Sequence, residues 1–132
     1  MAFYRREVGY KKYEDSGKIK TVETIVLSVL SDTSTMYDVM QKTLSKYYEN
    51  DIDSIWAAYD EYARECYRAL KVSGKNILLV SVDLCCADIE YMSEENSMWK
   101  ACAYTVFGVN SEQGIRILTL GLNNEYDRIT DA

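Results

Sequence analysis

The sequence lacks histidine and proline altogether. Without histidine there can be no Ser-His or Cys-His catalytic pair and no histidine-ligated metal. There is also no side chain whose ordinary pKa lies between pH 5 and 8. Because these absences remove the commonest catalytic groups, we expect a protein that is not an enzyme and that uses no cofactor and no metal.

Glycine is scarce, with six in 132 residues. No two glycines stand close enough to form the loops that hold phosphate in P-loop or dinucleotide-binding proteins, and the Gly-x-Ser-x-Gly elbow of many hydrolases is absent. Ser73-Gly74-Lys75 resembles the end of a phosphate loop. It follows a predicted helix rather than a strand, so we interpret Gly74 as a helix stop.

Long apolar runs and metal-type cysteine spacings are missing as well. The apolar run at 25–30 is interrupted by Ser28 and is too short for a secretory signal or a membrane span. The four cysteines stand in apolar, periodic segments and show no C-x-x-C spacing. We interpret them as reduced, buried small hydrophobes. We therefore expect a cytoplasmic protein in a reducing compartment, with no membrane partner.

Acidic residues outnumber basic ones by 21 to 15, which leaves a formal net charge of −6. This balance disfavours an extended nucleic acid as a partner, because that mode of binding needs a basic face. The charge is uneven, since residues 1–20 contain six basic and three acidic side chains. A basic N-terminal segment could attract a charged ligand or the acidic part of a second copy. Lysines at a hairpin edge also simply discourage aggregation.

The length of 132 residues predicts a single domain over residues 1–132. In residues 1–30 the side chains alternate loosely in a two-residue pattern on both sides of a turn signal at 14–17. This pattern predicts a basic β-hairpin. Residues 34–71 carry apolar side chains at three- and four-residue steps, which predicts a hairpin of two helices at about 34–49 and 54–71. The second of these holds more acidic than basic residues, so it is not expected to read DNA.

The spacing of the apolar residues changes after Gly74. Residues 77–84 are almost continuously apolar, which predicts a central strand covered on both faces, and we expect this strand to extend through Cys85 and Cys86 to Tyr91. Further strands are predicted at 98–109 and 115–122, completing a three-strand meander over 76–122 before a polar tail at 123–132. The predicted fold is α+β: an antiparallel sheet of about five strands, in the order β-β-α-α-β-β-β, with the helical hairpin packed on one face.

Carboxylates offer the remaining catalytic option. Asp83 lies within the apolar strand, and Asp88 and Glu90 follow it. A buried Asp83 would have a raised pKa and could act as a general base, and the three carboxylates together could hold a hard metal ion. We favour a structural role for Asp83, because buried polar groups are usually satisfied by hydrogen bonds.

Tyrosine is the one residue type present in surplus, with twelve in the chain. Its amphipathic ring suits surfaces that are exposed to water in the free protein and buried in a complex. Twelve tyrosine hydroxyls are also more than one small core can provide with hydrogen-bond partners. The competing interpretation is that tyrosines only rim an ordinary core.

Aromatic, basic and amide side chains gather near the start of the chain and in its last third. A ring, a guanidinium and an amide edge together provide the stacking and hydrogen bonds that a nucleotide needs. The candidate residues for binding a ligand or partner are Tyr4, Arg5, Arg6, Tyr10, Lys12, Tyr104, Phe107, Arg116, Asn123, Tyr126 and Arg128.

Three functions remain open. We expect first a non-catalytic, inhibitor-type interaction protein that binds a protein partner, or itself as a homodimer, through a tyrosine-rich surface. In composition the chain is similar to small inhibitors and immunity factors of bacteria and their phages, an analogy of class only. The alternative is a protein that binds or sequesters a small nucleotide-like ligand in an aromatic and basic pocket at a subunit interface. The third is an enzyme that uses a carboxylate or a cysteine.

Overall fold

The computed structural model describes residues 2–27, 34–48, 50–104, 115 and 119. Within these residues two helices come first, and from the second helix onward the chain alternates helices and short strands. The elements are α1 (Ala2–Asp15), α2 (Ser34–Lys46), β1 (Ser54–Ala57), α3 (Asp60–Ser73), β2 (Leu78–Val82), α4 (Cys86–Ser93) and β3 (Trp99–Ala103).

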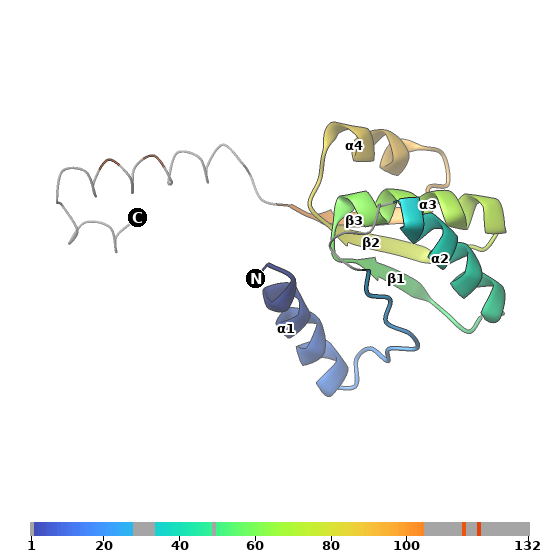
Figure 1. The fold of residues 1–132 in the computed structure, drawn as a ribbon, viewed down its shortest axis with the longest axis horizontal. Coiled ribbons are helices and arrows are strands. Elements are labelled where there is room, and N and C mark those ends of the chain that lie inside the picture. The colour runs from blue at the N-terminus through green and yellow to red at the C-terminus, as the bar shows by residue number, and fades with distance from the viewer. Residues whose placement is uncertain (1, 28–33, 49, 105–114, 116–118, 120–132) are drawn as a thin grey trace.

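The sheet has three strands in the order β1-β2-β3, and both pairings are parallel (Figure 1). Helix α3 connects β1 to β2, and α4 connects β2 to β3. The predicted antiparallel sheet of about five strands is therefore wrong. Parallel neighbours require a crossover connection, usually a helix, and the chain supplies one between each pair of strands. The observed architecture is α/β rather than α+β.

The predicted N-terminal hairpin is wrong too. Residues Ala2–Asp15 form α1, and the residues from 16 to 27 form no helix or strand. The loose alternation of this segment indicated a strand, but the same residues are compatible with a helix. The helix at Ser34–Lys46 falls within the helix predicted at 34–49, and this prediction is confirmed.

Two further segments differ from their predictions. The start of the second predicted helix, Ser54–Ala57, is strand β1, and the helix itself begins at Asp60. The expected extension of the central strand to Tyr91 is wrong, because Cys86–Ser93 form α4. The predicted strand at 98–109 is observed as Trp99–Ala103. The predicted strand at 115–122 and the tail at 123–132 lie outside the described residues, apart from the single positions 115 and 119.

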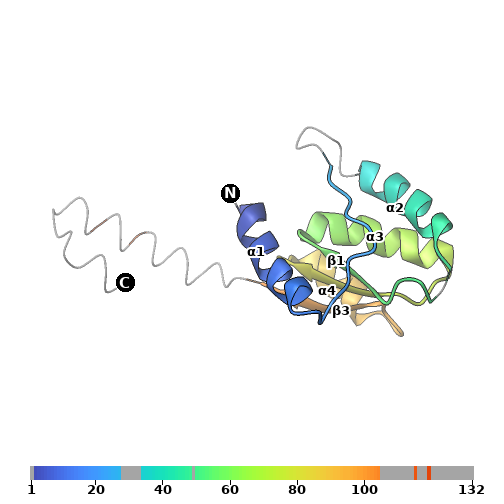
Figure 2. The same cartoon turned by 90° about the horizontal axis from the view of Figure 1, so that it is seen from below.

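The core lies between one face of the sheet and the helices α2, α3 and α4. Leu79 and Trp99 are buried on this face, and Trp99 Nε1 donates a hydrogen bond of 3.1 Å to Ser81 Oγ. Helix α2 packs on α3 (Figure 2), and both contribute to the core. The buried apolar residues are Met36, Met40, Leu44, Ala57, Ala63, Cys66, Tyr67, Ala69, Leu70, Ile77, Leu79 and Trp99.

The opposite face of the sheet is less covered. Leu78, next to the buried Leu79, is 46% exposed, and Trp56 of β1 is 39% exposed. Tyr10 of α1 stacks on Trp56, with ring centroids 5.6 Å apart. Helix α1 therefore lies beside β1, away from the layer formed by α3 and α4 (Figure 1).

Helix α3 ends where the sequence predicts. Gly74 follows its last residue with φ at 69°, and its N–H bonds to the carbonyl of Leu70. Only glycine adopts this left-handed conformation without strain. The interpretation of Gly74 as a helix stop is confirmed, and the chain turns there into β2.

Candidate ligand site at the carboxyl ends of the strands

The carboxyl ends of β1 and β2 lie side by side, because the two strands are parallel and in register from Ser54 and Leu78 onward. Ala58 and Tyr59 follow β1, and Asp83 follows β2. In open α/β sheets, ligands bind in the crevice outside the carboxyl ends of the strands. We call the group formed by Ala58, Tyr59 and Asp83 the strand-end site.

Asp83 is held in an unusual backbone conformation, with φ at 70°. Strand β3 fixes it on both sides: the Asp83 N–H donates to the carbonyl of Ala103 at 2.8 Å, and the Cys102 thiol donates to the carbonyl of Asp83 at 2.7 Å. A left-handed conformation is rare for residues other than glycine, and it clusters at functional sites. These bonds leave the carboxylate free to meet a partner at the sheet edge.

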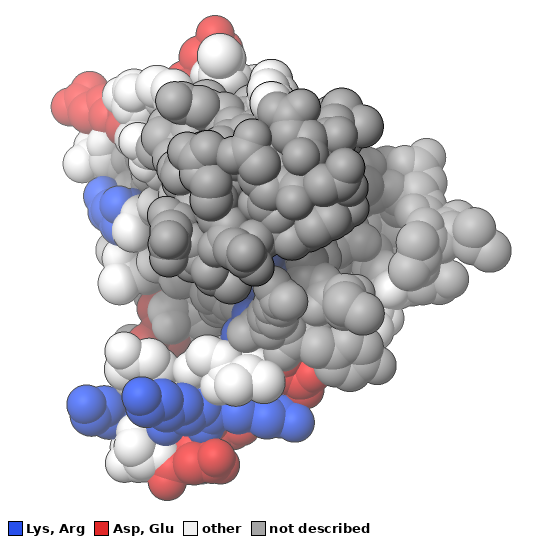
Figure 3. Space-filling model, turned by 90° about the vertical axis from the view of Figure 1, so that its left-hand side faces the viewer, with Lys and Arg blue, Asp and Glu red and all other residues white. Residues whose placement is uncertain are grey.

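That partner is Arg6 of α1. Its Nη2 donates to both oxygens of Asp83, at 2.9 and 2.8 Å, and its Nη1 donates to the carbonyl of Ala58. The guanidinium carbon lies 4.4 Å from the centre of the Tyr59 ring. The Arg6 and Asp83 side chains are only 20% and 30% exposed, so the pair is partly shielded from water and from salt. Figure 3 shows the side of the molecule that lies at the left in Figure 1, with a band of Lys and Arg in its lower part.

A second charged cluster joins the first turns of α3 and α4. Arg64 Nη1 lies 3.1 Å from Asp60 Oδ2, 2.7 Å from Asp88 Oδ1 and 3.1 Å from Cys85 Sγ. Burial favours a raised pKa for Asp88, but the hydrogen bonds from the Cys85 N–H and from Arg64 outweigh it and bring the pKa below 3.8. For Arg64, burial opposes the charge, but the hydrogen bond to Asp88 raises the pKa above its ordinary value.

The same cluster resembles a metal centre in outline, because ligand atoms of Asp60, Cys85 and Asp88 lie within 4.8 Å of one another. All three acceptors already share the Nη1 of Arg64. The cation that the cluster needs is therefore a guanidinium of the chain itself, and we assign no metal here. The predicted combination of Asp83, Asp88 and Glu90 does not form one site: Asp83 pairs with Arg6, Asp88 pairs with Arg64, and Glu90 is exposed on α4.

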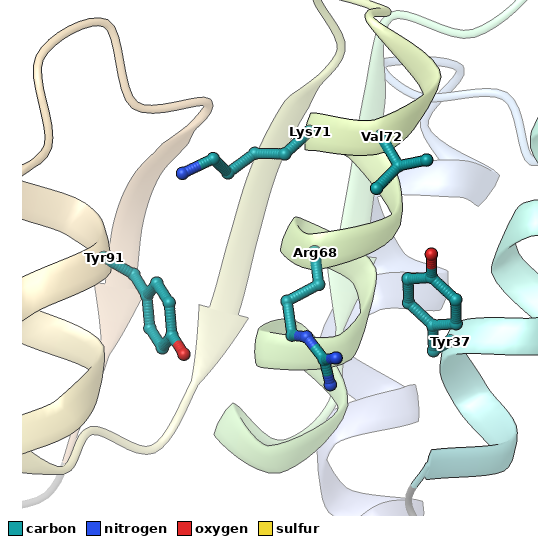
Figure 4. Close-up of a pocket in the computed structure, with 5 residues that line it drawn as sticks. All are labelled: Tyr37, Arg68, Lys71, Val72 and Tyr91. Atoms are coloured by element: carbon teal, nitrogen blue, oxygen red, sulfur yellow. The ribbon is translucent and has the colours of Figure 1, made fainter.

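A pocket of about 340 Å³ opens on the helical side of the molecule, lined by Tyr37, Arg68, Lys71, Val72 and Tyr91 (Figure 4). In this view Arg68 stands between Tyr37 of α2 and Tyr91 of α4. The charged groups of the pocket already have partners, since Arg68 pairs with a glutamate of its own helix at 2.9 Å and Lys71 pairs with Glu94 at 2.7 Å. An anion would have to break an ion pair to bind there.

The structure brings only part of the predicted binding set together. Arg6 and Tyr10 reach the sheet from α1, whereas Lys12 is exposed on the same helix. Tyr104 follows β3 and is 60% exposed. Tyr4 and Arg5 lie on α1. The other predicted residues, Phe107, Arg116, Asn123, Tyr126 and Arg128, lie outside the described residues.

Sequence reasoning missed Tyr59 and gave Asp83 a structural role. The signal for Tyr59 was its position just after β1, and the signal for Asp83 was its position just after the apolar run of β2. Such positions indicate a ligand-binding edge of the sheet only once the strands are known to be parallel. The interpretation of all four cysteines as buried holds for Cys66 alone: Cys85 and Cys86 are exposed at the start of α4, and Cys102 is only partly buried. No disulfide joins any of the four.

Two solved structures are similar to the chain. One is a sugar ABC transporter protein from Yersinia enterocolitica, with 28% sequence identity and a TM-score of 0.71; the match covers 77% of this chain and 31% of that one. The other is a 5-methylthioribose transporter solute-binding protein from Thermotoga lettingae, in complex with 5-methylthioribose, with 25% identity and a TM-score of 0.66; the match covers 76% of this chain and 32% of that one.

Other comparisons add no relative. No protein-family model matches the chain, and no curated protein matches it. In the described part of the chain, no helix has the length and apolar character that a membrane crossing requires. The chain spans about a third of the length of the two solved proteins. The chain is thus similar in fold to one part of two larger transporter proteins, and these likenesses agree with the α/β architecture described above.

Proposed function

We propose that the chain binds a small polar ligand at the strand-end site and does no chemistry on it. The proposal rests on one observation above the others: a carboxylate, a backbone carbonyl and an aromatic face meet at the carboxyl ends of two parallel strands. This is the edge where open α/β sheets hold their ligands. The two similar structures are a sugar transporter protein and a solute-binding protein in complex with 5-methylthioribose, which supports a small-ligand role.

The three groups have complementary roles in such a site. The Asp83 carboxylate and the Ala58 carbonyl accept hydrogen bonds from ligand N–H or O–H groups. The Tyr59 ring offers a flat face for a planar group or for the apolar side of a sugar ring. The alternative that the sequence suggested, small-ligand binding, is retained in this coarser form. Its nucleotide-like ligand and its pocket at a subunit interface have no support in the described contacts.

The interaction surface rich in tyrosine remains a prediction. Tyr13, Tyr48 and Tyr104 are all more than half exposed, but they come from three different parts of the chain: the end of α1, the segment after α2 and the segment after β3. No described ring contact joins any two of these three tyrosines, so small-ligand binding has the stronger support.

Thermal unfolding with a ligand panel tests the proposal. Ribose, 5-methylthioribose, glucose and adenosine monophosphate are each added in large excess. A ligand at 100 times its Kd stabilises the folded state by about 2.7 kcal/mol, which is a rise of several degrees in Tm. We expect such a rise with at least one sugar-like compound, and we expect Asp83→Asn to abolish it.

Asp38→Asn is the matched control, because Asp38 is exposed on α2 and its loss removes the same charge far along the chain from the strand-end site. It should keep the ligand-induced rise. A rise that survives in Asp83→Asn would place the ligand elsewhere and refute the site. No rise with any small polar compound, in the wild type and in a variant with Arg6 removed, would refute the function.

A further inference from the structure

Every group of the strand-end site that faces Arg6 is a hydrogen-bond acceptor or an electron-rich surface. The Asp83 carboxylate meets Nη2, the Ala58 carbonyl meets Nη1, and the Tyr59 ring lies under the guanidinium carbon. Carboxylate, carbonyl and aromatic face are the partners that a planar, donor-only cation requires.

We infer that the strand-end site recognises a guanidinium-type ligand and that α1 fills it with Arg6 as an internal competitor. The inference rests on the proposed function, since it names the ligand class for the same site. Arg6 uses both terminal nitrogens within the chain, so it acts as an occupant of the site and not as a donor left open for a ligand. An incoming ligand must replace it.

The contacts of α1 fit a displaceable element. Besides Arg6, its described packing on the sheet is the stack of Tyr10 on Trp56. Among the side chains of α1 whose burial the structure describes, from Arg6 onward, two apolar ones are largely exposed: Val8 is 71% exposed and Tyr13 is 54% exposed. An amphipathic helix that is docked firmly would bury such side chains against the core. Among the described contacts of α1, the free energy of releasing the helix therefore lies mainly in the side chains of Arg6 and Tyr10.

The segment after α1 keeps the helix close even when it is released. Glu23 accepts hydrogen bonds from Lys46 at 3.0 Å and from the Tyr47 hydroxyl at 2.9 Å, and Ile25 and Leu27 pack against the core. A tether of this length holds Arg6 near the site at an effective concentration of about millimolar or more. The ligand thus competes with Arg6, a cation that is always close to the site. Its apparent affinity equals its intrinsic affinity multiplied by the fraction of molecules in which the site is open.

The test uses the full chain and two small probes, methylguanidine and methylammonium, with binding followed by NMR titration. We expect Arg6→Ala to bind methylguanidine at least about tenfold more tightly than the wild type, because the competitor is gone. Arg6→Lys should lie between the two, since an ammonium cannot bond the carboxylate and the carbonyl while stacking on the ring. Methylammonium should bind all variants more weakly than methylguanidine does.

Lys11→Ala is the matched control. Lys11 is an exposed cation on the same helix, paired with Glu7 within α1, so its loss removes equal charge without emptying the site. It should bind methylguanidine as the wild type does. Hydrogen exchange gives a second readout: methylguanidine should speed exchange of the α1 amides in the wild type, and Arg6→Ala should show the fast rate without ligand.

Equal methylguanidine affinity in Arg6→Ala and the wild type would overturn the inference, and so would unchanged exchange of α1 on binding. If Arg6→Ala binds 5-methylthioribose but not methylguanidine, the ligand class is wrong and the proposed function stands. If Arg6→Ala binds neither compound and circular dichroism shows it folded, both proposals fail.

Discussion

The guanidinium of Arg64 lies 2.7 Å from the carboxylate of Asp88, a side chain with no exposed surface. This pair joins α3 to the first turn of α4, where the Asp88 carboxylate also accepts a hydrogen bond from the Cys85 N–H. The two helices connect successive strands of the sheet, so the pair holds both crossovers at the edge that carries the strand-end site. Its loss should affect the stability of the fold rather than a ligand contact.

Replacing Asp88 with asparagine should destabilise the protein by about 3 kcal/mol, because it removes the buried carboxylate of the pair and leaves Arg64 with Asp60 alone as a charged partner. Chemical denaturation measures the change in the free energy of unfolding. Glu90→Gln is the control, since Glu90 is exposed on the same helix, and it should stay within about 0.5 kcal/mol of the wild type. Equal effects from the two substitutions would show that the Arg64 pair does not stabilise the fold.

The same carboxylate should make the protein sensitive to acid. The pKa of Asp88 lies below 3.8 in the folded state, so the unfolded state binds more protons in this range. The stability that Asp88 contributes is therefore present above pH 3.8 and is lost as the pH falls through the lower, folded value. Glu23 and Glu94, whose pKa values are lowered from 4.5 mainly by hydrogen bonds from lysines, should act in the same direction.

Denaturation between pH 3 and pH 8 checks this expectation. The wild type should lose stability more steeply below about pH 4 than Asp88→Asn does. Between pH 6 and pH 8 the free energy of unfolding should stay nearly flat, because the chain has no histidine. A steep change in that window would reveal a titrating group that the described contacts do not account for.

Replacing Gly74 with alanine should lower the free energy of unfolding by about 1 kcal/mol, because the residue keeps φ at 69° and a Cβ disfavours that conformation. No atom lies within 4 Å of the added Cβ, so the cost is conformational and not a clash. Gly9→Ala is the counterpart within α1 and should favour the helix by up to about 1 kcal/mol. Thermal unfolding and helix content by circular dichroism distinguish the two, and a Gly74→Ala variant as stable as the wild type would contradict the cap.

The cysteines should differ sharply in reactivity. Burial raises the pKa of the Cys66 thiol to about 12, so this residue should resist alkylation by iodoacetamide at pH 8 in the folded protein. Cys85 and Cys86 are exposed and should react first. Cys102 should react slowly, because burial raises its pKa as well. Peptide mass spectrometry follows each site, with denatured protein as the control in which all four react. Native labelling of Cys66 as fast as Cys85 would disagree with the structure.

Local patterns predicted several elements correctly. The helix at Ser34–Lys46, the stop at Gly74 and the strand at Leu78–Val82 each depend on signals within a few residues: apolar spacing, a residue that tolerates positive φ, and a run of apolar side chains. These signals are intrinsic to a short stretch of chain, and the surrounding structure agrees with them.

Short or ambiguous segments were predicted wrongly. Strand β1 is only four residues long, Ser54–Ala57, and its apolar residues continue the three- and four-residue spacing of α3. Only Asp83, Leu84 and Cys85 separate the apolar strand from helix α4, so Cys86–Ser93 looked like an extension of the strand. A segment of four to eight residues contains too few helical turns or strand pleats to distinguish the apolar spacing of a helix from that of a strand.

The candidate site depended even more on tertiary structure. Arg6 was a predicted binding residue, but its partner Asp83 is 77 positions away in the sequence, and no local pattern links them. Alone, the sequence determined the acidic balance, the absence of histidine chemistry, the start of α2 and the stop of α3 at Gly74. Only the folded chain decided that the strands run parallel, because the hydrogen bonds between strands join segments that are distant in sequence. That direction places Tyr59 and Asp83 at one edge, where Arg6 can reach both.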